Sequence, residues 1–435
     1  MKRLLIQTQL SNYNTDGQFI LECDSGWQMV MGRVREMLRL NPELSIDVMG
    51  PYIDLDGQHQ LVTPPHLVNP DLFDQYGDRL KYIEHWIQPN ALATRYDFDY
   101  TQLAWSLRLD LGKEYPRRRY DAVYINDPMH LRNFKALFHL KGGYQPKFFV
   151  HSHFVDDPSC PKFPTDASLW LGQVEAAIKA DWNFWQCQST LDIVKDEMSK
   201  LYLPHVVDAV MAKSTPWDDG YSRAETLTYS AKNLRFDPQQ LARWKNEGKA
   251  IVFLPNRIGG KGRSSDYTNC GKFMFELLPQ LRQRRQDFVV LAGNPSQKIL
   301  NRELEEWCGP NGYVSLVPDT FTRDEFKFVA SMSDIAVGLY DQDSYGGTAA
   351  RECIQLGCVP LWVKKYEYAT IAKEANWPYV ADNVGNNLVL MADALIQLVQ
   401  SGKHKAWLPQ LKQVIESRCS YEATTPVAMK LMGLL

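Results

Sequence analysis

Short apolar runs alternate with amphipathic stretches along most of the chain. The runs that suit buried strands include Leu4–Gln9, Asp121–Ile125, Lys147–Val150, Trp182–Gln186, Ala250–Leu254 and Ile335–Leu339. Between them, apolar residues recur at helical spacing, as in Thr165–Lys179, Ser189–Leu201 and Thr322–Met332. Strands that alternate with helices in this way predict parallel sheets with helices on both faces.

The alternation is interrupted once, near the middle of the chain. Residues 211–248 give a mixed pattern, and Ser214–Gly220 is rich in turn-forming residues. We therefore predict one α/β domain over residues 1–210, a hinge region over 211–248, and a second α/β domain that opens with the strand Ala250–Leu254 and covers residues 249–420. A length of 435 residues is enough for two separate cores.

The most informative stretch is Ser333–Val363. It predicts a buried strand, a loop with the paired glycines Gly346 and Gly347, a helix that ends at Gly357, and a second buried strand. Ligands of open α/β sheets bind at the carboxyl ends of strands, where this loop lies. The glycines allow a close approach of the backbone, and the amides of the helix start favour an anion. Glu352, one turn into the helix, adds a carboxylate suited to sugar hydroxyls.

This stretch resembles the donor-binding motif of retaining glycosyltransferases with the GT-B fold, the glycogen-synthase-like group. The resemblance implies that Glu352 binds the nucleotide ribose and that Gly346 and Gly347, with their neighbours Tyr345 and Thr348, contact the donor. At the position of the family's first glutamate this sequence has Ser344, with Asp343 beside it. The role of that glutamate toward the transferred sugar therefore falls to Asp343, to Ser344 or to the backbone.

A second signature follows the strand Ala250–Leu254. Arg257 and Lys261, in the segment Pro255–Gly262, resemble the arginine and lysine with which the family holds the donor diphosphate. Breaking the bond between sugar and phosphate places negative charge on the phosphate, which fixed cations stabilise. Two signatures in the expected order, each after a strand, imply two Rossmann-like doubly wound domains that face each other across a cleft. The resemblance also implies that the final helix, in residues 421–435, crosses back to the first domain.

The resemblance assigns further residues at other strand ends. His151 is the first choice for the family histidine near the transferred sugar, and His153 is the second. A histidine that only caps or packs at a strand end is the alternative for both. Asn294 lies in a loop that holds the base in the family, and Asp16 and Gly17 lie in the loop after the first strand. Asn126, Asp127, His153 and Asp16 are our candidates for the acceptor side.

Composition restricts the partners. A net charge of −3 and a pI near 6.3 give no general attraction to nucleic acid or to anionic membranes. No apolar stretch suits a signal peptide or a membrane span, and the eight cysteines form no CxxC pair. We therefore expect reduced thiols, a cytoplasmic location and no metal or cofactor, with the nucleotide sugar, a UDP-sugar as first choice, serving as a substrate.

The sequence thus predicts a retaining glycosyltransferase that acts on an acceptor hydroxyl. A glycan, a small molecule or a hydroxymethylated DNA base, as in phage DNA modification, are the acceptors considered. One alternative is a non-catalytic relative that binds a nucleotide sugar or glycan, which the missing first glutamate favours. Another is a dinucleotide-dependent oxidoreductase, although no GxGxxG follows Leu4–Gln9 or Ala250–Leu254.

Overall fold

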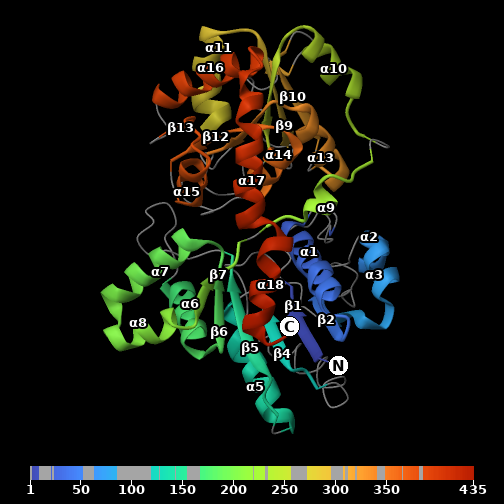
Figure 1. Ribbon diagram of the computed structural model, residues 1–435, viewed down its shortest axis with the longest axis vertical. Coiled ribbons are helices and arrows are strands. Elements are labelled where there is room, and N and C mark those ends of the chain that lie inside the picture. Colours follow the sequence, from blue (N-terminus) through green and yellow to red (C-terminus); the bar gives the residue numbers. More distant parts are fainter. Residues whose placement is uncertain are drawn as a thin grey trace. The chain divides into compact units, whose positions relative to one another are not determined.

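The computed structural model divides into two compact α/β units (Figure 1). Unit 1 comprises Met1–Asp218 together with Tyr421–Leu435, and unit 2 comprises Asp219–Ser420. The structure describes residues 2–8, 21, 24–51, 63–85, 119–126, 128–142, 144–153, 167–218, 220–230, 234–255, 272–294, 307–308, 312–318, 321–339, 348–364, 366–381 and 386–435.

Unit 1 is built on a seven-stranded sheet in which every described pair of neighbours is parallel. The strand order is β3-β2-β1-β4-β5-β6-β7. The strands are β1 (Lys2–Gln7), β2 (Leu44–Pro51), β3 (Leu80–His85), β4 (Ala122–Ile125), β5 (Lys147–Ser152), β6 (Trp182–Trp185) and β7 (Ser214–Pro216). The chain adds strands first on one side of β1 and then on the other, so the order reverses between β1 and β4, where ligands of such sheets bind.

Helices cover both faces of this sheet because the strands are apolar on both sides. Leu4 and Ile6 belong to the apolar cluster that includes residues of α1, whereas Leu5 belongs to the opposite cluster, which includes Phe134 and Phe138 of α5. The helices and short helical turns of unit 1 are α1 (Ser25–Leu40), α2 (Pro65–Val68), α3 (Pro70–Tyr76), η2 (Gly77–Arg79), η4 (Pro128–His130), α5 (Leu131–Gly142), α6 (Ala167–Lys179), α7 (Gln188–Leu201), α8 (Pro204–Met211) and α18 (Tyr421–Met432).

Helix α18 returns the end of the chain to unit 1, beside α1 (Figure 1). A Cβ atom at Gly32 of α1 would lie 2.2 Å from Cε2 of Tyr421, so only glycine allows the tyrosine ring to pack this closely. Lys2 Nζ donates to the Gly433 carbonyl, and Asn41 Nδ2 donates to the Leu434 carbonyl at 2.6 Å. Tyr421–Leu435 is therefore an integral part of unit 1.

Unit 2 repeats the plan with a six-stranded sheet in the order β10-β9-β8-β11-β12-β13, again with parallel neighbours. The strands are β8 (Ala250–Leu254), β9 (Phe288–Asn294), β10 (Val314–Pro318), β11 (Ile335–Gly338), β12 (Val359–Val363) and β13 (Val380–Ala381). The helical elements are α9 (Arg223–Thr226), α10 (Pro238–Asn246), the π-helical turn η5 (Lys272–Leu277), α11 (Leu278–Arg284), α13 (Arg323–Met332), α14 (Thr348–Leu356), α15 (Tyr366–Glu374), α16 (Asn386–Gln400), η6 (Lys403–Ala406) and α17 (Leu408–Cys419).

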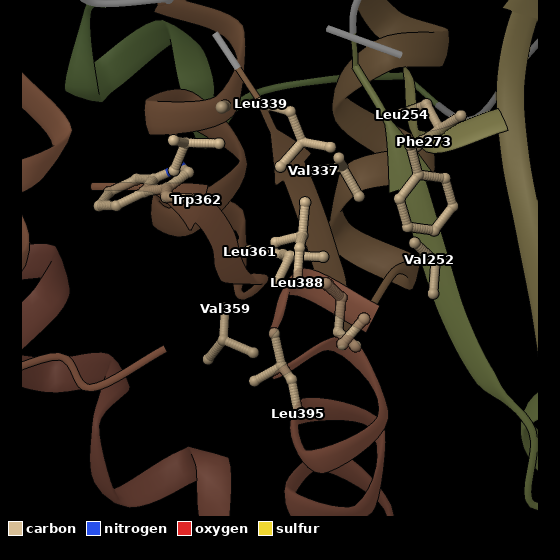
Figure 2. Close-up of a cluster of buried hydrophobic side chains, with 14 of the residues drawn as sticks. Val252, Leu254, Phe273, Val337, Leu339, Val359, Leu361, Trp362, Leu388 and Leu395 are labelled. Atoms are coloured by element: carbon tan, nitrogen blue, oxygen red, sulfur yellow. The ribbon is translucent and has the colours of Figure 1, made fainter. Parts of the chain in front are cut away.

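The larger apolar cluster of unit 2 lies between the sheet and α16. Figure 2 shows Val337 and Leu361 of the central strands with Leu388 and Leu395 of α16 in this cluster. The opposite face of β8 contributes Ile251 and Phe253 to a second cluster. Two faces of buried β-branched and aliphatic residues explain why the strands of this unit read as continuous apolar runs.

The predicted fold class, two doubly wound parallel α/β domains, is confirmed. The loop expected over Ser214–Gly220 is wrong at its start, because Ser214–Pro216 forms β7 and pairs with β6. Further along, α10 begins in the stretch expected to be irregular. Its N-cap Asp237 accepts from the Gln239 amide, and Pro238 occupies the first turn, so a start signal was present in the sequence. No helix in the described ranges is long and apolar enough to cross a membrane.

Candidate functional site

In unit 2, the strands that lead into the two predicted signatures are neighbours. β8 and β11 pair in parallel, with Ile335 opposite Val252 and Ala336 opposite Phe253, and the strand order reverses between them. The segments that follow these strands therefore leave the sheet at the same edge. The residues expected there lie outside the described residues: Arg257, Lys261, Asp343, Ser344, Tyr345, Gly346 and Gly347.

Three further donor-side predictions are described. Thr348 is the first residue of α14, as expected for a helix start after the glycine loop. Asn294 is the last residue of β9, the strand next to β8. Glu352 lies in α14 and is 3% exposed.

Glu352 is held by side chains from two other helices. Arg323, the first residue of α13, forms a two-pronged ion pair with it, in which Nη1 donates to Oε2 at 2.7 Å and Nη2 donates to Oε1. Thr226 of α9 donates its hydroxyl to Oε1 at 2.6 Å. Paired hydrogen bonds from a guanidinium fix both the position and the plane of a carboxylate.

The surroundings keep the buried Glu352 ionised. Burial raises the pKa of Glu352, but the charge and hydrogen bonds of Arg323, the Thr226 hydroxyl and the charge of Lys327 together hold it below its usual value. Lys327, one turn along α13, donates to the carbonyls of Glu225 and Thr228, at 3.0 Å for the latter. Burial, reinforced by the charge of Arg323, lowers the pKa of Lys327. A buried anion between two cations is the electrostatic feature of this part of unit 2.

Sequence reasoning missed Arg323 and Thr226. One signal for Arg323 was available. A cation in the first turn of a helix opposes the helix dipole, so an arginine directly after the N-cap Thr322 points to a partner elsewhere. Thr226 is 126 residues from Glu352 and carried no comparable signal.

In unit 1, the predicted histidines lie at the carboxyl end of β5, near the reversal of strand order: the strand runs two residues further than expected, so His151 lies within it and His153 directly after it. The His151 ring is fully buried, and its plane is 8° from that of Trp217, with ring centroids 5.7 Å apart. Its Nδ1 lies 2.6 Å from Arg33 Nη1 and 2.6 Å from the Tyr124 hydroxyl. Arg33, also buried, donates from Nη2 to the Asp218 carbonyl at 3.0 Å. Sequence reasoning missed this buried arginine.

These contacts decide the protonation of His151. A guanidinium can only donate, so Nδ1 accepts, and the neutral ring carries its proton on Nε2. Burial, followed by the charges of Arg33 and His153, lowers the pKa of His151 well below its usual value, while a hydrogen bond to the Trp217 backbone acts in the opposite direction. The ring is therefore neutral and bonded within the protein, which agrees with the packing alternative for this residue and leaves its catalytic role a prediction.

His153 and Asn126 form a second contact at this edge. Asn126 Nδ2 donates to the Gln7 carbonyl at 2.6 Å, so its Oδ1 faces His153 Nε2 at 2.9 Å and accepts from it. The rings of His151 and His153 lie 4.2 Å apart. The structure thus brings together the ends of β1, β4 and β5 through three predicted residues. Asp16, Gly17 and Asp127 lie outside the described residues.

The depressed pKa of His151 predicts a pH dependence of stability. The unfolded chain takes up a proton near pH 6.5 that the folded chain excludes, so the free energy of unfolding should fall as pH falls below this value, by up to about 1.4 kcal/mol per pH unit. Urea denaturation between pH 7.5 and 5.5 measures this slope. His151→Asn, which cannot titrate, should show a shallower slope, and equal slopes in the two proteins would contradict the assignment.

Within the described ranges, no group of three histidine, cysteine, aspartate or glutamate side chains is arranged to hold a metal ion.

The sequence matches no protein-family model and no curated protein. The structure, however, is similar to Anabaena HepE in complex with UDP-glucose, with a TM-score of 0.60 at 10% identity over 100% of both chains. It is also similar to the α,α-trehalose 6-phosphate synthase of Burkholderia multivorans, with a TM-score of 0.64 at 12% identity over 100% of this chain and 98% of that one. A glycosyltransferase from Rickettsia africae gives a TM-score of 0.61 at 11% identity over 99% and 98% of the two chains.

Similarity over the full length of both chains extends to both units and their order. This similarity agrees with the strand order of both sheets. At 10–12% sequence identity it shows a shared fold. The chain therefore has the two-domain GT-B fold that it shares with these structures.

Proposed function

We propose that the chain is a retaining glycosyltransferase that moves a sugar from a nucleotide sugar to an acceptor hydroxyl. The observation that carries this proposal is the pairing of β8 with β11 where the strand order of unit 2 reverses. It supports a donor site in which the segment with Arg257 and Lys261 lies beside the glycine loop before α14. The fixed, ionised Glu352 supports ribose binding at the same edge.

In this proposal the donor lies on unit 2. Glu352 accepts a hydrogen bond from a ribose hydroxyl, and Asn294 lies near the nucleotide base. Gly346, Gly347 and Thr348 at the start of α14 receive the diphosphate, together with Arg257 and Lys261. A uridine donor is the first choice, because HepE was solved with UDP-glucose and a similar trehalose-phosphate synthase from Burkholderia xenovorans is described as UDP-forming.

The proposed reaction breaks the bond between the anomeric carbon and the phosphate oxygen. The acceptor hydroxyl attacks from the face that the phosphate leaves, and the phosphate takes the acceptor's proton, so the configuration is retained. Arg257 and Lys261 neutralise the charge that develops on the diphosphate, which removes the need for a metal ion. Asp343 and Ser344 position the sugar. Asn126 and His153, with Asp16 and Asp127, form the acceptor side, and the buried His151 supports it.

A thermal-shift panel tests the proposal, with UDP, GDP, ADP, their sugars, NAD(H) and NADP(H). A ligand at a hundred times its dissociation constant should stabilise the fold by about 2.7 kcal/mol. We expect stabilisation by one nucleoside diphosphate, reduced in Glu352→Gln. The matched control is Glu325→Gln. Glu325 is also buried and also pairs with an arginine, Arg235, but its carboxylate accepts from the backbone amide of Thr322 and so caps the start of its own helix, α13.

The outcomes separate the three functions considered. Stabilisation only by a nicotinamide dinucleotide would replace the proposal with an oxidoreductase. Nucleotide-sugar binding would leave catalysis to be tested by incubation with glycans, small hydroxyl compounds and DNA containing hydroxymethylated bases. NMR of the product's anomeric proton would then show retention or inversion. Binding without transfer to any of these acceptors would favour the non-catalytic relative.

A further inference from the structure

Arg323 occupies a position that its own helix disfavours. It directly follows the N-cap Thr322, whose hydroxyl accepts from the Glu325 amide while the Glu325 carboxylate accepts from the Thr322 amide. Asp324 and Glu325 suit the positive end of the helix dipole, whereas an arginine there opposes it. The side chain of Arg323 is 33% exposed, and that of Glu352 beneath it is 4% exposed. The arginine thus serves the carboxylate of another helix rather than the stability of α13.

The hydrogen bonds to Glu352 leave one acceptor position. An ionised carboxylate has about four lone-pair sites. Oε1 accepts from Arg323 Nη2 and from the Thr226 hydroxyl, and in the described part of the chain Oε2 accepts only from Arg323 Nη1. Among the described residues, Oε2 therefore keeps one lone pair without a donor, in a direction fixed by the plane of the ion pair.

We propose that Arg323 is a positioning residue for donor binding, which holds Glu352 so that the remaining lone pair of Oε2 accepts a single ribose hydroxyl. This inference rests on the proposed function, and it assigns a role to a residue that contacts the donor only through Glu352. Thr226 completes the arrangement by occupying Oε1, so that Oε2 alone is available to the ribose.

The charged and polar groups around Glu352 determine how its pKa should change when Arg323 is removed. They are Arg323 and Lys327 from α13 and Thr226 from α9, with Glu225 and Asp324 near Lys327 and the thiol of Cys353 beside Glu352 on α14. On the α17 side, Arg351 bonds to Cys419 Sγ and Gln355 bonds to the Lys412 carbonyl. The adjacent strands β11 and β12 are apolar. Without Arg323, Lys327 is the cation of the described residues that still lowers the pKa of Glu352, and burial should raise this pKa.

The first experiment compares UDP binding to wild type and Arg323→Ala by calorimetry from pH 6.5 to 9. A hydrogen bond to a charged group exceeds one to a neutral group by about 1.4 kcal/mol, so the variant should bind about tenfold more weakly at pH 6.5. The ratio of the two dissociation constants should then shrink as pH rises and Glu352 ionises. Arg323→Lys restores a cation, so its ratio to wild type should stay constant with pH.

The matched control is Arg235→Ala. Arg235 also forms a two-pronged ion pair, through Nε and Nη2, with the buried Glu325 of α13, but it takes no part in the proposed site. This variant should lose stability and keep the affinity of wild type. Equal UDP affinity in Arg323→Ala and wild type at all pH values would overturn the positioning role. UDP with a 2′- or 3′-deoxyribose adds a further check, because only one of the two should bind more weakly.

A second measurement needs no ligand and separates this inference from the proposed function. If Arg323 keeps Glu352 ionised, the folded Arg323→Ala protein binds a proton at Glu352 that the unfolded chain releases above about pH 4.5. The difference in Tm between wild type and variant should then grow from pH 5 to pH 7. If the Tm difference grows with pH but no nucleoside diphosphate binds, the electrostatic role of Arg323 would stand, whereas the proposed function and the ribose contact would both be contradicted. A constant difference would overturn the electrostatic role, whatever the ligand.

Discussion

Lys261→Ala is expected to lower the rate of sugar transfer by about 10²–10³-fold while leaving the fold intact. The reason lies in the charge of the leaving group, which grows as the bond between sugar and phosphate breaks. A fixed ammonium group stabilises this charge more in the transition state than in the bound donor, so its loss should lower kcat more than it weakens donor binding.

Lys249→Ala provides the control. Lys249 directly precedes β8 and so lies at the amino end of this strand, whereas the segment that contains Lys261 follows the strand in the sequence. Lys249 forms an ion pair with Glu247 at 2.8 Å, well away from the carboxyl edge of the sheet. Release of nucleoside diphosphate, measured with the donor and acceptor found by the panel, gives both rates. Unchanged turnover in the Lys261 variant, with circular dichroism like that of wild type, would contradict the glycosyltransferase proposal.

Arg33→Met is expected to destabilise unit 1 by about 1–3 kcal/mol, the cost of leaving buried hydrogen-bond acceptors without their donor. Its guanidinium donates to His151, Tyr124 and the carbonyls of Trp217 and Asp218, and it lies 4.1 Å from the Trp217 ring centroid. Methionine fills similar space, but it leaves these buried acceptors without their donor. The midpoint of urea denaturation measures the loss.

The matched control lies two residues further along α1. Arg35 pairs with the exposed Asp71 at 2.8 Å, and its side chain is 26% exposed. Arg35→Met should therefore cost less than about 1 kcal/mol. Similar losses in both variants would show that the buried network around His151 contributes no more than a surface ion pair.

Local pattern predicted the framework because each strand and helix has its own signal. Ala250–Leu254 coincides with β8, the strand expected at Trp182–Gln186 is β6, and the helix expected after Gly347 is α14. In a doubly wound sheet these elements also place their ends, since ligand-binding loops follow the carboxyl ends of strands. The position of Glu352 in a helix beside the reversal of strand order thus followed from the sequence.

The partners of the predicted residues could not be read from the sequence in the same way. Arg33 of α1, Tyr124 of β4 and Trp217, which follows β7, meet His151, and Arg323 and Thr226 reach Glu352 from two further helices. Such contacts depend on how helices pack on the sheet, which hydrophobic periodicity does not specify. The sequence could therefore predict which groups lie at the edge of a sheet, but not which of them already have hydrogen-bond or ion-pair partners within the protein.

The return of the chain to unit 1 has a consequence for synthesis. Unit 2 is a single uninterrupted segment inserted between β7 and α18, so all of its residues are available before Tyr421–Leu435 is made. Domains generally fold as units during translation. The face of α1 around Gly32 therefore stays uncovered until Tyr421 has been made. Unit 1, although translated first, thus depends on Tyr421–Leu435 to complete its core.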